Sequence, residues 1–125
     1  EKQSILYPIR TLTARGVRVA AGSDAPVGPI DPLLCLYGAV ARATRAGRKV
    51  CRQEGVSFLE ALSNQTLNAA FAAFQEEIKG SITPGKRADL VLLSRRISTE
   101  DPDVLKETFV EKTLLQGEIV WERSA

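Results

Sequence analysis

The chain has 125 residues, which is enough for one small domain with one hydrophobic core. Apolar residues make up 44% of it and charged residues 26%, as in an ordinary soluble globular protein. The net charge of +2 is too small to indicate a nucleic-acid or membrane surface, and no apolar run is long enough to span a bilayer. We therefore expect neither nucleic acid nor a membrane among its partners.

Two scarce residue types, histidine and cysteine, further limit the kinds of catalytic and metal site that the chain can form. The chain contains no histidine, so it can form neither a Ser-His-Asp triad nor a histidine metal site by itself. Cys35 and Cys51 lack CxxC spacing. Two reduced thiols explain them best, which predicts a cytoplasmic protein. The first residue is Glu1 rather than methionine, so we expect a piece of a longer protein or a processed product.

The N-terminal third has an α/β pattern. Apolar residues recur at helical spacing within residues 4–15, with Pro8 near the first turn and Gly16 as the stop. The alternating "VRVAAG" of residues 17–22 predicts a short strand. Residues 23–32 contain three prolines and predict a rigid loop.

Two further helical regions follow. One helix is predicted over residues 33–47 with Gly47 as its stop, and a polar loop over residues 48–56. Ser57 and Glu60 have the spacing of a capping box at the start of the next helix. The polar "SNQT" interrupts that helix, and Thr66 is a candidate N-cap for a second short helix.

Beyond residue 79 the pattern becomes rich in β-strand features. Thr83-Pro84-Gly85 suits a type II turn, and "ADLVLLS" after it predicts a strand. Gln116-Gly117 separates two short apolar runs, as in a hairpin. We therefore place a domain boundary near residue 79.

Five motifs resemble a known family when they are taken together, although each is weak alone. They are, in chain order, "GVRVAAGSDAPVGPIDPL", "YGAVARAT", "EALSNQTLNAAFAAF", "KGSITPGKRADLVLLS" and "LLQGEIVWE". Over about residues 4–123 the chain resembles the C-terminal quarter of metal-dependent amidohydrolases. Within this family it is most similar to the large-insert branch that includes N-substituted formamide deformylase.

The resemblance implies an α/β fold in two parts. Residues 1–79 would be the last helix-strand-helix units of a (β/α)8 barrel, and residues 80–125 would be strands of a small composite β-sandwich. It also implies a divalent metal, usually zinc, held by histidines of earlier strands and by an aspartate that closes the eighth strand. "VRVAAGSD" matches that strand, so the resemblance places the catalytic and metal-binding aspartate at Asp24. Since the first seven strands and all histidines are missing, this chain alone is expected to be inactive and to bind no metal tightly.

Asp24 has two interpretations that the residue pattern leaves open. A carboxylate at the C-terminal end of a strand, beside a loop shaped by glycine and proline, lies where barrel enzymes carry their chemistry. Such a group can accept the proton of an attacking water and can ligate a metal. The alternative is a turn or helix cap formed by Ser23-Asp24, which the pattern alone favours. The family resemblance reverses that preference for the parent enzyme.

The other conspicuous residues have structural interpretations. Ser23 is expected to donate or accept a hydrogen bond in the loop, and Asp89 to pair or cap a turn. Trp121 is expected to pack at a sheet edge rather than to bind a ligand. Arg42 belongs to a basic cluster that is expected to be a solvated helix face, whose other members are Arg45, Arg48, Lys49 and Arg52.

Two functions of different classes follow. In the first, the parent protein hydrolyses a carbon–nitrogen bond of a small-molecule amide, formamide or cyclic amide, and Asp24 takes part directly. In the second, the chain is a non-catalytic unit that folds against a partner or against itself, because the predicted strand and the predicted helices would have uncovered edges and apolar faces. A homo-oligomer is compatible with both.

Overall fold

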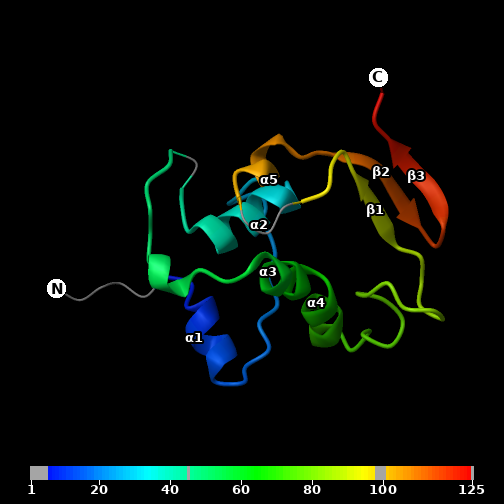
Figure 1. Cartoon of the computed structure of the whole chain (residues 1–125). Coiled ribbons are helices and arrows are strands. Elements are labelled where there is room, and N and C mark those ends of the chain that lie inside the picture. The colour runs from blue at the N-terminus through cyan, green and yellow to red at the C-terminus, as the bar shows by residue number, and fades with distance from the viewer. Residues whose placement is uncertain (1–5, 45, 98–100, 125) are drawn as a thin grey trace.

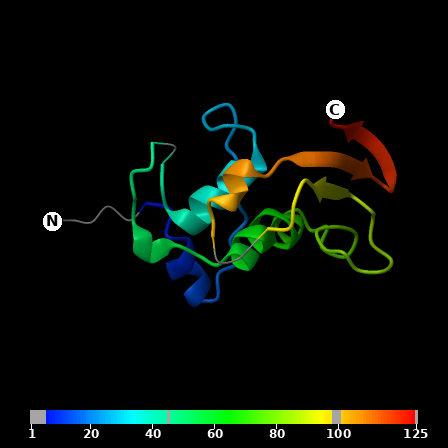
Figure 2. The ribbon, with the colours of Figure 1, turned by 45° about the horizontal axis from the view of Figure 1, so that its top comes forward.

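The computed structural model describes residues 6–44, 46–97 and 101–124. A body of short helices occupies one side of the molecule, and a three-stranded antiparallel sheet stands beside it (Figure 1). The turned view shows the same separation of helices and sheet (Figure 2). All three strands of the described residues follow residue 79, and the domain boundary near that residue stays a prediction.

Helix α1 spans Ile9–Ala14, directly after Pro8, and Gly16 follows it with a φ of +79°. Of the helix predicted over residues 4–15, residues 4 and 5 lie outside the described residues, residues 6–8 and 15 are not helical, and the stop at Gly16 is confirmed. The prediction of a strand over residues 17–22 is wrong for the chain as it stands. A strand requires a neighbour to bond its main chain, and the described residues provide no second strand at this place.

Helix α2, Pro32–Ala41, begins with a side-chain cap, because the Asp31 carboxylate accepts a hydrogen bond from Leu33 N at 2.9 Å. It ends well before the predicted stop, since Arg42 adopts a left-handed φ of 49°. The chain then reverses through a bridge between Ala43 and Lys49. Gly47 lies in this reversal with a φ of +80°, so it ends a turn and not a helix.

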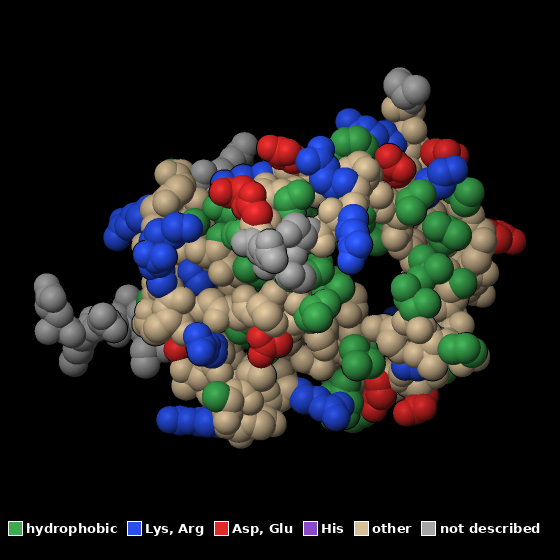
Figure 3. Space-filling view, in the orientation of Figure 1, with side chains coloured by type: hydrophobic (Ala, Val, Ile, Leu, Met, Phe, Trp, Pro, Cys, Tyr) green, Lys and Arg blue, Asp and Glu red, His purple; other side chains and the backbone are tan. Residues whose placement is uncertain are grey.

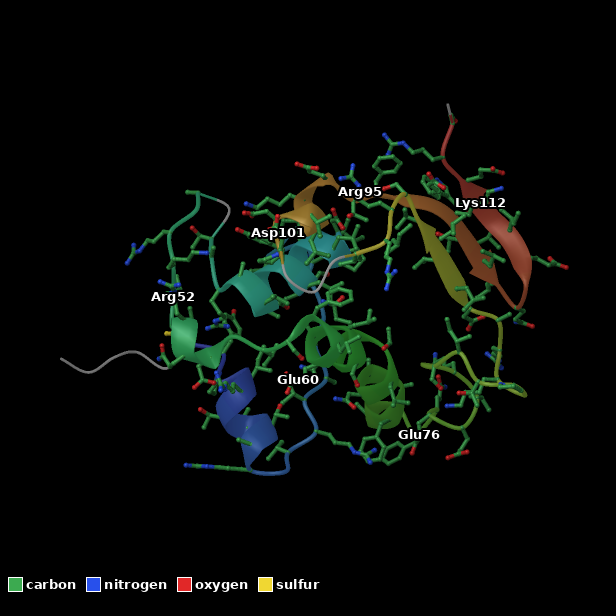
Figure 4. The ribbon with its side chains drawn as sticks, viewed as in Figure 1. Arg52, Glu60, Glu76, Arg95, Asp101 and Lys112 are labelled. Carbon is green, nitrogen blue, oxygen red and sulfur yellow. The ribbon has the colours of Figure 1, made fainter. Side chains whose placement is uncertain are left out.

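The middle of the chain contains a 3-10 helix over Arg52–Glu54, helix α3 over Phe58–Gln65 and helix α4 over Leu67–Ala72. The capping box of Ser57 and Glu60 is confirmed: Glu60 N donates to Ser57 Oγ at 3.2 Å, and Ser57 N donates to Glu60 Oε2 at 2.9 Å. Figure 4 shows Glu60 at this end of α3. Thr66 is the N-cap residue of α4, but its hydroxyl donates to Leu62 O at 2.8 Å and caps nothing.

The sheet has the order β1-β2-β3, with β1 over Leu90–Leu93, β2 over Val110–Leu115 and β3 over Glu118–Glu122. The predicted hairpin is confirmed, with positive φ values of 54° at Gln116 and 89° at Gly117. The predicted type II turn is also present, since Lys86 N donates to Thr83 O at 3.1 Å and Gly85 has a φ of +92°.

The buried core lies between α2, α3 and the short helix α5, Val104–Glu107, which connects β1 to β2. Its most deeply buried member is Leu105, with 1% of its surface exposed. The other buried members are Leu33, Leu36, Tyr37, Val56 and Ala61.

The sheet contributes little to this core. Large apolar side chains remain half-exposed on all three strands, among them Val91, Leu92, Ile119, Val120 and Trp121. Figure 3 shows hydrophobic side chains gathered over the sheet. The ion pair of Lys112 with Glu122, at 2.7 Å, joins β2 to β3, and Figure 4 shows Lys112 on the sheet. Because the strand order is β1-β2-β3, the outer strands β1 and β3 each have an unpaired edge among the described residues.

The prediction of a solvated face for the arginine cluster is wrong for Arg42. Its side chain is buried, and its guanidinium donates to the main-chain oxygens of Leu6 at 2.6 Å, Val50 at 3.3 Å and Cys51 at 3.3 Å. Arg48 is exposed and Arg52 lies in the 3-10 helix, while Arg45 lies outside the described residues.

A buried carboxylate completes this region. Both Glu54 oxygens accept from Thr11, through the main-chain N–H at 3.0 Å and the hydroxyl at 2.5 Å. These hydrogen bonds, the side-chain one first, lower the pKa of Glu54 below its ordinary value. Arg42, through Leu6, and Glu54, through Thr11, thus connect the region around α1 to the loop that follows α2.

Candidate functional site

Asp24 lies two residues beyond an extended segment, residues 17–22, which ends beside the prolines of the loop. Its backbone is left-handed, with a φ of 54°, a conformation that aspartate tolerates better than most residues. Its side chain is exposed. Within the described ranges, no other group forms a hydrogen bond or an ion pair with its carboxylate.

The loop is shaped by main-chain contacts around Asp24. Its carbonyl oxygen accepts hydrogen bonds from Val27 N at 2.8 Å and from Gly28 N at 3.3 Å. Gly28 passes so close to Ser23 that a Cβ on it would lie 2.7 Å from the Ser23 carbonyl oxygen. The Ser23 hydroxyl accepts from Ala25 N at 3.4 Å, as predicted for a loop hydrogen bond. Ser23 thus makes the side-chain contact of this turn, and the Asp24 carboxylate remains available for other partners.

A pocket of about 540 Å³ opens beside the extended segment. Its walls come from α1, residues 19–22, α2 and α3, and most of the lining side chains are apolar. Asp24 does not line it, although Gly22 does. Cys35 lines it too, and burial, followed by the nearby Asp31 carboxylate, raises the pKa of this thiol. A raised pKa disfavours the thiolate, which is the nucleophilic form of cysteine.

Two asparagines hold the extended segment, and the sequence interpretation missed them. The Asn68 side chain donates through Nδ2 to Val19 O at 3.2 Å, and Ala21 N donates to the main-chain oxygen of Asn64 at 3.0 Å. Both lie in or beside "SNQT", which we interpreted only as a break in the apolar pattern. Their spacing of four residues, which would place both side chains on one face of an uninterrupted helix, was the feature that could have revealed the pair.

The described residues do not make a metal centre by themselves. No group of three or more histidine, cysteine, aspartate or glutamate side chains in residues 6–44, 46–97 and 101–124 is arranged to hold a metal ion. The Asp24 carboxylate is exposed and could provide one oxygen ligand, and the described residues form no group around it with further ligands of these types. Any metal at this place would therefore need donors other than the described residues.

The other predicted residues lie apart from Asp24 or have structural roles. Asp89 caps the hairpin as expected, since its Oδ1 accepts from Gln116 N at 2.9 Å. Trp121 lies on the edge strand β3 with 48% of its surface exposed. Arg42, which directly follows α2, donates hydrogen bonds to main-chain carbonyls and also lines the pocket. The described part of the chain contains no helix with the length and apolar character needed to cross a membrane.

Comparison with known proteins identifies what this arrangement belongs to. A family model described as "Amidohydrolase family" matches residues 1–121. The chain is 38% identical over 119 residues to N-substituted formamide deformylase of Arthrobacter pascens, covering 95% of this chain and 22% of that protein. It is 30% identical over 122 residues to imidazolonepropionase of Thermoplasma acidophilum, covering 94% of this chain and 27% of that protein.

A solved structure shares the same arrangement. An amidohydrolase from Thermotoga maritima superposes with a TM-score of 0.71 at 29% identity, covering 92% of this chain and 26% of that one. The chain thus spans about a quarter of the length of the relatives that it matches.

Proposed function

Because this chain belongs to the amidohydrolase family, we propose that it forms the C-terminal portion of an enzyme that hydrolyses carbon–nitrogen bonds in small molecules. Two of its relatives carry names that point to this chemistry, a formamide deformylase and an imidazolonepropionase. The substrates that we propose are non-peptide amides, formamides or cyclic amides. The observation that carries the proposal is the match of the family model to nearly the whole chain.

We propose that residues 1–79 complete a (β/α)8 barrel and residues 80–125 a small β-sandwich. The extended segment supports the first part, because it lies between helices as a barrel strand would and has no strand beside it among the described residues. The apolar pocket beside it is the space that an adjacent strand and its side chains would fill. The half-exposed apolar residues of the sheet support the second part, because a sandwich would cover them.

In this proposal Asp24 is the proton-transfer group of the active site. It stands at the C-terminal end of the segment that we assign to the last barrel strand, where barrel enzymes place their catalytic side chains. Its carboxylate would accept the proton of the attacking water and give it to the leaving nitrogen. The absence of any described hydrogen-bond partner leaves both oxygens available for this task.

We propose a divalent metal, zinc by expectation, as the cofactor of the parent enzyme. A bound metal would supply a polarised carbonyl and a water of lowered pKa. Asp24 would contribute one oxygen ligand, and the remaining ligands would come from outside this chain.

The structure also favours a second candidate, a non-catalytic unit that associates with itself. The unpaired edges of β1 and β3 and the exposed apolar side chains of the sheet are surfaces that tend to associate. The two candidates differ in one respect that can be measured, because only the first predicts turnover of an amide by the parent protein.

A panel of small amides tests the proposal. We expect the parent protein, purified with its bound metal, to release amine or ammonia from at least one N-substituted formamide, simple amide or cyclic amide, followed by chromatography of the products. Removal of the metal with a chelator should abolish the release and addition of zinc should restore it. A protein of the full parent length that binds zinc but hydrolyses no member of the panel would contradict the proposed reaction.

A further inference from the structure

The segment that leads to Asp24 is anchored on one structural unit, the pair of helices α3 and α4. The Asn68 side chain of α4 donates to the main-chain oxygen of Val19, and the main-chain oxygen of Asn64 in α3 accepts a hydrogen bond from the N–H of Ala21. The guanidinium of Arg18 lies over the ring of Phe71 in α4, 4.2 Å from its centroid. Three contacts on four consecutive residues therefore fix this segment from one side.

The two asparagines also support each other. Asn64 is buried, with 4% of its surface exposed, and Asn68 is half-buried. In one orientation of the Asn64 amide, its Oδ1 accepts from Asn68 Nδ2 at 2.9 Å. In the other orientation, its nitrogen donates to Val19 O at 3.0 Å. In both orientations an asparagine side chain donates to the main-chain carbonyl of Val19. A carbonyl left without a hydrogen-bond donor would destabilise the folded state.

Only Gly22 and Ser23 separate the anchored Ala21 from Asp24. On its other side Asp24 is fixed by the turn that Val27 and Gly28 close on its carbonyl oxygen. The carboxylate is therefore held between two anchors, one on α3 and α4 and one in the loop. A shift of the first anchor would rotate or translate Asp24 with little effect on the turn itself.

From this geometry we propose that Asn68, together with Asn64, is a positioning residue for Asp24. It acts through the main chain of residues 19–21 and does not touch substrate. The inference rests on the proposed function, because it assigns the asparagines a role in the reaction that Asp24 performs. The rate of an enzymatic reaction depends steeply on such placement, since a misplacement of about 1 Å can lower a rate by roughly 100-fold.

The test compares two variants of Asn68 with a matched control in the metal-loaded parent enzyme. Asn68→Ala removes the donor that Asn68 itself provides to the Val19 carbonyl, and Asn68→Asp keeps the size of the side chain but puts an oxygen against that carbonyl. Thr66→Ala is the control, because it deletes one side-chain hydrogen bond at the same helix junction without touching residues 17–24. We expect both Asn68 variants to lower kcat by about 10- to 100-fold with KM nearly unchanged, and Thr66→Ala to leave kcat within about twofold.

Hydrogen exchange provides a readout that does not depend on activity. In both Asn68 variants the amide of Ala21 should exchange faster than in the wild type, while the amides of β2 should keep their protection. An Asn68→Asp variant with wild-type kcat would overturn the proposal, whatever Asn68→Ala does. Faster exchange at Ala21 with an unchanged kcat would overturn it as well, because the anchor would then be released without consequence for the reaction.

Failure of this inference can be told apart from failure of the proposed function. If Asp24→Asn keeps the turnover rate, the role of Asp24 is wrong and the positioning role falls with it. If Asp24→Asn abolishes turnover while the Asn68 variants behave like Thr66→Ala, only the positioning role is wrong.

Discussion

Replacing Asp24 with asparagine in the parent enzyme should lower kcat by about 100- to 10,000-fold, the range that general acid–base groups contribute. The change keeps the size of the side chain but removes its ability to hold a proton, and it leaves the main-chain bonds of the loop intact. The stability of the protein should therefore change little. Steady-state kinetics on the best amide substrate, together with thermal unfolding, measures both effects.

Asp89→Asn is the matched control for this experiment. Asp89 accepts one hydrogen bond from Gln116 N in the hairpin, and an asparagine can still accept it. We expect this variant to keep the wild-type kcat. A kcat of Asp24→Asn within about threefold of the control would show that Asp24 has the alternative role of a loop residue.

The second large effect is expected in the core. Leu105→Ala should lower the free energy of unfolding by about 2–5 kcal/mol, because Leu105 is 1% exposed and the truncation leaves a cavity. Leu105 lies in the short helix α5, which packs on α2. The cation–π contact of Lys106 with the Tyr37 ring, 4.3 Å from its centroid, lies on the same interface. Because α5 connects β1 to β2, the loss of this packing should also loosen the connection between the helices and the sheet.

Urea denaturation of the 125-residue chain measures this effect, with Leu59→Ala as the control. Leu59 lies in α3 with 66% of its surface exposed, so the same deletion should change the free energy of unfolding by less than about 0.5 kcal/mol. Equal effects of the two variants would mean that α5 does not form part of the core in solution.

Local features with a short-range physical cause could be predicted from the sequence. The capping box of Ser57 and Glu60, the Thr83-Pro84-Gly85 turn and the Gln116-Gly117 hairpin all depend on residues within a few positions of one another. The cap of the hairpin by Asp89 was expected only as an unspecified pairing, because its partner is 27 residues away.

Features that depend on distant residues could not be predicted. Arg42 resembled a surface arginine at a helix end, yet the main-chain carbonyls of Leu6, Val50 and Cys51 surround its guanidinium. Residues 17–22 have the alternation of a strand, but no described neighbour completes the hydrogen-bond ladder.

The candidate site, too, could be predicted only in part from the sequence. The sequence indicated Asp24 and its loop, because glycine, proline and aspartate mark this turn directly. It did not indicate the support from Asn64 and Asn68, since that contact joins residues more than forty positions apart. The resemblance to a family added the proposed reaction, which composition and spacing alone did not provide.

The intact mass of the protein that carries this chain in its native source tests the central claim most directly. If the chain is the C-terminal portion of a carbon–nitrogen hydrolase, the mass will be several-fold above the 13.6 kDa of these residues, because the relatives are several times as long. A native product of 13.6 kDa would contradict the account, since Asp24 would then stand without the other groups that the reaction needs.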